Sequence, residues 1–114
     1  MALPESWLIT AEQLCDVLLK EAARFGADPL PAIRLQDAVF VEVTDPANSL
    51  PSYEGIWRNP QGIRCGSLTL NSDGSYYAEY DVLNLHPEKP NWFVESVTVW
   101  GRDGVVKAMI ELGD

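Results

Sequence analysis

Two Asp-Gly pairs in the second half of the chain constrain its fold more than any other feature. The first pair, Asp73-Gly74, separates two segments rich in β-branched and aromatic residues, 63–70 and 75–83. The second pair, Asp103-Gly104, lies between two more segments of this kind. Asp-Gly flanked by such residues is among the strongest short-range signals for a β-hairpin. The sequence therefore predicts two antiparallel hairpins.

The chemistry of these turns also assigns the faces of the strands. A three-residue loop that ends at a left-handed Gly74 sets Leu70 opposite Tyr76, and a two-residue loop sets Val99 opposite Ala108. In these registers the apolar residues gather on one face, and a slip of one residue would mix the two faces. The other face is polar but unusually aromatic. Its candidate partner-binding residues are Tyr77, Glu79, Asp81, Thr98 and Trp100.

The N-terminal part of the chain predicts one amphipathic helix, at about residues 10–25. Thr10 and Gln13 have the spacing of a capping box, and apolar residues follow at helical intervals. Gly26 stands where a left-handed C-cap residue is expected. The apolar stripe of this helix is most simply explained as cover for a sheet.

The order of the elements indicates an α+β fold. Segment 44–53 contains two prolines and several hydroxyl side chains, and it predicts a long loop. The expected strands lie at about residues 38–43, 53–58, 63–70, 75–83, 92–100 and 105–112. We expect one N-terminal helix packed on one face of a 4–6-stranded, mainly antiparallel meander sheet, in a single domain over residues 1–114.

The composition excludes several classes of function. The chain has 17 acidic and 8 basic residues, a net charge of −9, and this charge would repel nucleic acids and anionic membrane surfaces. No apolar run approaches the roughly 20 residues of a membrane helix, and residues 1–5 do not resemble the start of a signal peptide. Cys15 and Cys65 form no metal or redox motif. We therefore expect a cytoplasmic protein with free thiols, and no cofactor or metal.

The residues that could carry catalysis have simpler explanations. His86 is the only histidine, and it lies in a proline-rich connection. Cys65 is expected opposite Asp81, whose charge would disfavour a reactive thiolate. Glu79 and Asp81 are spaced about 7 Å apart along one strand, as on many solvated sheet faces. The chain also contains no nucleotide-binding, hydrolase or metalloprotease motif. We predict no catalytic residue.

The best hypothesis from the sequence is a protein-binding module that uses the aromatic sheet face to bind a basic partner or a second copy. The general features resemble, at the level of fold class, those of bacterial immunity proteins and secretion chaperones. An alternative is a small-molecule-binding domain with a Tyr/Trp-lined pocket, and a Cys- or carboxylate-dependent enzyme comes third. The sequence leaves open whether residues 1–9 or 44–53 cover the aromatic face. It also leaves open the partner and the biological process.

Overall fold

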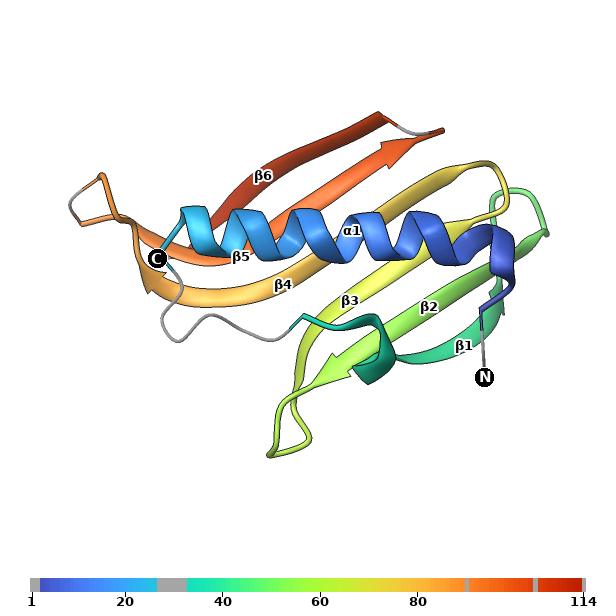
Figure 1. The fold of residues 1–114 in the computed structure, drawn as a ribbon, viewed down its shortest axis with the longest axis horizontal. Coiled ribbons are helices and arrows are strands. Elements are labelled where there is room, and N and C mark those ends of the chain that lie inside the picture. The colour runs from blue at the N-terminus through green and yellow to red at the C-terminus, as the bar shows by residue number, and fades with distance from the viewer. Residues whose placement is uncertain (1–2, 27–32, 90, 104, 114) are drawn as a thin grey trace.

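The structure, a computed structural model, describes residues 3–26, 33–89, 91–103 and 105–113; for residues 111–113 only the backbone is described. Helix α1 (Glu5–Arg24) comes first, followed by the short 3-10 helix η1 (Leu35–Asp37). Six strands complete the fold: β1 (Val39–Thr44), β2 (Pro51–Arg58), β3 (Arg64–Asn71), β4 (Ser75–Leu85), β5 (Phe93–Arg102) and β6 (Val105–Gly113). They form one antiparallel sheet in the order β1 to β6, and α1 crosses one face of it (Figure 1).

This arrangement confirms the expected α+β fold with a helix on one face of a meander sheet. Each strand begins and ends within two residues of its expected position. The predicted loop over 44–53 is shorter than expected, because β1 extends to Thr44 and β2 already begins at Pro51. Proline is tolerated as the first residue of a strand, so it did not delay β2.

Both predicted hairpin registers are confirmed. In the first, Leu70 pairs with Tyr76, and Gly74 has a φ of +89° in the loop between β3 and β4. In the second, Val99 pairs with Ala108. Arg102 pairs with Val105, so two residues connect β5 to β6; one of them, Gly104, lies outside the described residues.

The predicted start of the helix is wrong. α1 begins at Glu5, with Pro4 at its N-cap and no side-chain capping bond, so Thr10 lies inside the helix. The extra turn is held by tertiary contact, because the Trp7 ring meets the Tyr53 ring edge-on at 5.0 Å. The C-terminal end agrees with expectation, since Gly26 has a φ of +80° just after the helix. No helix in the described ranges is long and apolar enough to cross a membrane.

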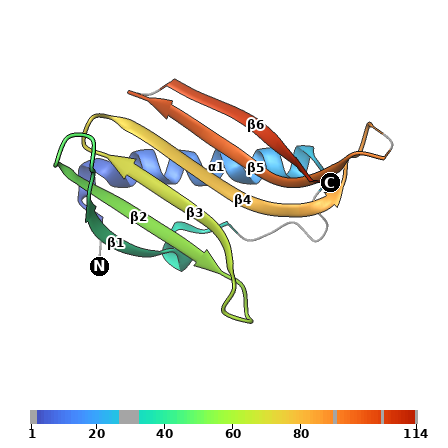
Figure 2. The same cartoon turned by 180° about the vertical axis from the view of Figure 1, so that it is seen from behind.

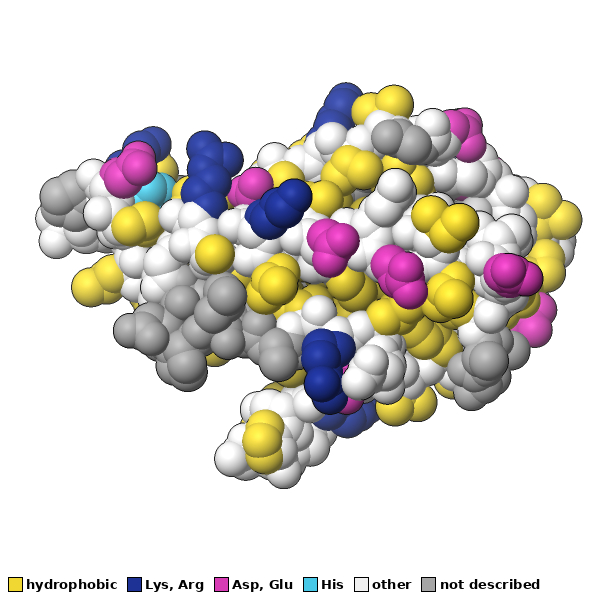
Figure 3. All heavy atoms as spheres, viewed as in Figure 1, with side chains coloured by type: hydrophobic (Ala, Val, Ile, Leu, Met, Phe, Trp, Pro, Cys, Tyr) yellow, Lys and Arg dark blue, Asp and Glu magenta, His cyan; other side chains and the backbone are white. Residues whose placement is uncertain are grey.

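The hydrophobic core lies between α1 and the sheet. α1 contacts β3, β4 and β5, and its acidic side chains lie along its exposed surface (Figure 3). The buried side chains of the core come from α1, from the segment just before η1 and from strands β1 to β5. They are Ala11, Leu14, Cys15, Leu18, Ile33, Phe40, Trp57, Leu68, Leu70, Tyr76, Ala78, Val97 and Val99. The face of the sheet toward α1 is called the inner face below, and the opposite face the outer face.

Candidate protein-binding face

No described element covers the outer face of the sheet. Figure 2 shows the molecule from behind, with the strands in front of α1. Trp7 packs on Tyr53, which pairs with Leu70 on the inner face, so the N-terminal segment does not reach the outer face. Residues 51–53 belong to β2 itself. The described residues of the two segments considered as a cover, 3–9 and 44–53, therefore do not hide the outer aromatic residues.

Tyr77 and Trp100 lie opposite each other on the outer face, near the start of β4 and the end of β5. They are paired across β4 and β5. Tyr77 is 40 % exposed and Trp100 is half-buried. The Tyr77 hydroxyl donates a hydrogen bond to Glu79 Oε2 at 3.1 Å. The structure therefore brings two of the predicted aromatic residues together beside a predicted carboxylate.

Glu79 and Asp81 form an acidic strip next to the aromatic pair. Glu79 lies 3.5 Å from the guanidinium of Arg64, measured from Oε1 to Nη2. The pKa of Asp81 is raised by partial burial, and the charges of Glu79 and Glu95 raise it further, while Arg64 lowers it. The carboxylates of Glu79 and Glu95 repel the ionised Asp81, and a positive charge from outside would reduce this repulsion. The strip is thus chemically suited to a cation.

Thr98 is the predicted residue that the structure hides most. It pairs with Glu79 in the register of β4 and β5 and shares the outer face, but it is only 2 % exposed. Its hydroxyl has no hydrogen-bond partner among the described residues. Because the longer side chains around it cover this small residue, Thr98 forms part of the floor of the outer face.

The predicted position of Cys65 opposite Asp81 is wrong. β3 contains a bulge at this point, because Trp57 pairs with Gly66 while Arg58 pairs with Arg64. The unpaired Cys65 packs against the core, with Sγ 3.4 Å from the hydroxyl of Tyr80. Burial, together with the bond to Cys65, raises the pKa of Tyr80. Nothing in this contact supplies the base or cation that activates a thiol.

His86 has a structural role in the connection between β4 and β5. Its Nδ1 accepts hydrogen bonds from the backbone amides of Glu88 at 3.0 Å and Lys89 at 3.1 Å. Its ring also meets Phe25 and Trp92 edge-on. An imidazole nitrogen that accepts two amide bonds is occupied in holding the loop.

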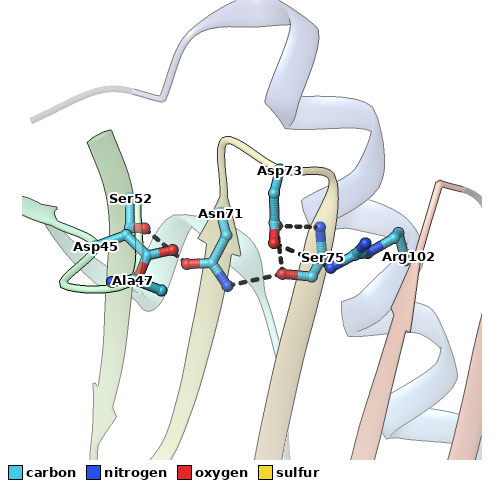
Figure 4. Close-up of polar contacts among 7 residues, drawn as sticks. All are labelled: Asp45, Ala47, Ser52, Asn71, Asp73, Ser75 and Arg102. Atoms are coloured by element: carbon cyan, nitrogen blue, oxygen red, sulfur yellow. Dashed lines mark hydrogen bonds and ion pairs between the residues drawn. The ribbon is translucent and has the colours of Figure 1, made fainter. Parts of the chain in front are cut away.

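A chain of polar contacts ties the strands together at one end of the sheet (Figure 4). The Ser52 hydroxyl donates to Asn71 Oδ1, and the Asn71 amide donates to the Ser75 hydroxyl. Ser75 in turn donates to Asp73, which Arg102 also contacts at 3.0 Å. The bonds from Ser75, more than Arg102, lower the pKa of the Asp73 carboxyl. These partners satisfy one another, so the cluster is explained as a clamp across β2, β3, β4 and β5.

The cavities in the described parts of the chain lie away from the outer aromatic pair. One of about 280 Å³ lies between the first turns of α1 and the hairpin loops and is lined by Trp7, Thr10 and Tyr76, among others. A second, of about 420 Å³, lies between α1 and η1, with Leu8 and Leu35 in its wall. Among the described residues, no three of His, Cys, Asp or Glu are grouped to hold a metal ion. No protein-family model, curated protein or solved structure matches the chain.

Proposed function

We propose that this chain is a small protein-binding module whose outer sheet face contacts a basic protein partner. One observation carries the proposal: a sheet face that no described element covers, with Tyr77 and Trp100 paired on it across β4 and β5. Exposed aromatic side chains are enriched at protein interfaces, where they act as anchors in desolvated contacts. In this role Thr98 supports the floor under the anchors.

Charge supports a basic partner rather than a neutral one. The acidic strip of Glu79 and Asp81 borders the aromatic pair, and Arg64 is the cation that the structure places near it. The net charge of the chain, −9, acts in the same direction at longer range. A field of this sign accelerates encounter with a positively charged protein and disfavours nucleic acid.

The alternative functions have less support. The lining residues of the described cavities include neither Tyr77 nor Trp100, which weighs against a ligand pocket built from the outer aromatic residues. The contacts of His86 and Cys65 with their neighbours weigh against an enzyme. A cytoplasmic location belongs to the same proposal, and the free thiols of Cys15 and Cys65 are compatible with it.

Capture of a partner from a lysate of the source cell tests the anchors. We expect Tyr77→Ala and Trp100→Ala to weaken the captured complex by about 2 kcal/mol or more, mainly through faster dissociation. Trp92→Ala is the matched control, because Trp92 is 42 % exposed but lies in the connection between β4 and β5, under Lys89. Equal capture by the wild type and all three folded variants would show that the outer face does not bind the partner.

The acidic strip is tested by the kinetics of the same complex. We expect Glu79→Gln to slow association and reduce its dependence on salt, with little change in dissociation, because charges near the rim act mainly on encounter. Glu88→Gln, in the exposed connection before β5, makes the same change in net charge away from the strip. A complex that responds equally to both substitutions would be steered by net charge alone.

A further inference from the structure

β6 is an open edge of the sheet. It pairs with β5 on one side, and no described strand lies on the other. Every described side chain from Val105 to Met109 is exposed, and most of them are apolar. A long apolar edge with unpaired backbone groups is a template for another strand unless something blunts it.

The rest of the molecule leaves room beside β6. α1 lies over β3, β4 and β5, and hydrophobic side chains remain visible beyond the helix, over β5 and β6 (Figure 3). On the inner face Val106 and Ala108 are exposed, and on the outer face Met109 is exposed. A strand can therefore approach β6 without meeting a described element on either face.

The opposite edge, β1, is less suitable. It has six residues where β6 has nine, and it leads directly into the turn that contains Pro46. Phe40 on its inner face is buried in the core, and Leu35 and Gln36 of η1 line the same cavity as Phe40. Its one charged residue is Glu42, which adds to the repulsion between two acidic chains.

We propose that β6 pairs antiparallel with β6 of a second copy of this chain, joining two sheets into one continuous sheet. A two-fold axis at Met109 is the register that the charges favour. It sets Lys107 opposite position 111 of the second copy, which is Glu in the sequence. A lysine in an edge strand normally discourages pairing. Here the symmetric register gives that lysine an opposite charge across the strands, which stabilises an antiparallel pair.

This dimer uses the edge of the sheet and leaves the outer face open, so it does not depend on the proposed function. The interface is isologous, because each copy contributes the same strand. It would place two copies of the Tyr77 and Trp100 pair on one extended surface. A monomeric protein could still bind a partner through the outer face, and a dimeric one could fail to bind any.

Sedimentation equilibrium of the full chain from 5 to 200 μM tests the proposal. We expect the wild type to associate to a dimer and no further. Met109→Lys should raise the dimer dissociation constant at least 10-fold, because the axis then brings two ammonium groups face to face. Val41→Lys is the matched control: Val41 lies on the β1 edge with 49 % exposure, against 48 % for Met109, and the change in charge is the same. This variant should remain dimeric.

Several outcomes would overturn the proposal. A wild type that is monomeric at 200 μM removes it, and so does a dimer that survives Met109→Lys. Loss of association in both lysine variants, or growth beyond the dimer, would indicate β6-to-β1 contacts that do not close. Circular dichroism checks folding, and if Met109→Lys unfolds the chain, Lys107→Glu takes its place with the same expected weakening.

Discussion

At the scale of single residues, Asp81 is a charge that the folded state holds at a cost. Partial burial, Glu79 and Glu95 raise its pKa. A carboxyl whose folded pKa exceeds its unfolded value binds its proton more tightly when folded. The resulting stabilisation is present at low pH, below the unfolded pKa, and is lost as the pH rises through the folded pKa. At neutral pH the ionised Asp81 therefore disfavours folding.

We expect Asp81→Asn to stabilise the protein at pH 7 by up to about 0.5 kcal/mol, or roughly 2–4 °C in melting temperature. The gain should shrink as the pH falls toward the range in which Asp81 is protonated in the wild type. Thermal melts between pH 3 and 7 measure both effects. Glu54→Gln makes the same charge change at an exposed position of the outer face. If the two variants gain equally, the effect belongs to net charge.

Alternation along a strand predicts which face a residue shares, but not whether it is covered there. Thr98 shares the outer face with Tyr77 and Trp100 as predicted, yet it is buried because its neighbours are larger. Cys65 escaped prediction for another reason. The bulge that turns it toward Tyr80 inserts a residue into the pairing, and the signal that could have indicated it is Gly66, the next residue inside the strand.

At the scale of elements, α1 stabilises the fold through its buried stripe. Leu18 is fully buried between the helix and the sheet, so Leu18→Ala should lower the free energy of unfolding by ~2–5 kcal/mol. Leu8→Ala, on an exposed part of the same helix, is the control and should cost less than ~1 kcal/mol. Urea denaturation measures both. A small loss at Leu18 would mean that the sheet does not need the helix in this position.

The hairpins were predictable because several local signals agree on them. The left-handed glycine fixes the length of the first loop, and the alternating pattern then selects one register. The start of α1 was not predictable, because the local capping pattern and the tertiary packing favour different first residues. The capping-box spacing at Thr10 is genuine, but packing of Trp7 on Tyr53 extends the helix past it.

At the scale of the whole molecule, a six-stranded sheet with one covered face leaves the other face and two edges for interactions. The proposed partner surface and the proposed dimer edge use different parts of it. The net charge of −9 affects both, because it attracts a basic partner and repels a second copy. Which association dominates therefore depends on ionic strength: salt weakens the attraction to the partner and screens the repulsion between copies.

The same charge acts on the fold itself. At neutral pH its self-repulsion opposes the compact state. The ion pairs between described residues lie at the surface, where each contributes little and salt removes little. We therefore expect 0.3 M NaCl to raise the melting temperature at pH 7 by several degrees relative to 10 mM buffer.

Near pH 4.4, where the net charge calculated from the sequence is zero, the same addition of salt should have little effect. Differential scanning calorimetry at both pH values, on the Met109→Lys variant to limit dimer formation, separates screening of charge from association. Replacing NaCl by sucrose of equal osmolality controls for general exclusion from the protein surface. A rise in melting temperature that is equal at both pH values would show that the salt acts through hydration. Repulsion among the acidic side chains would then contribute little to the free energy of unfolding.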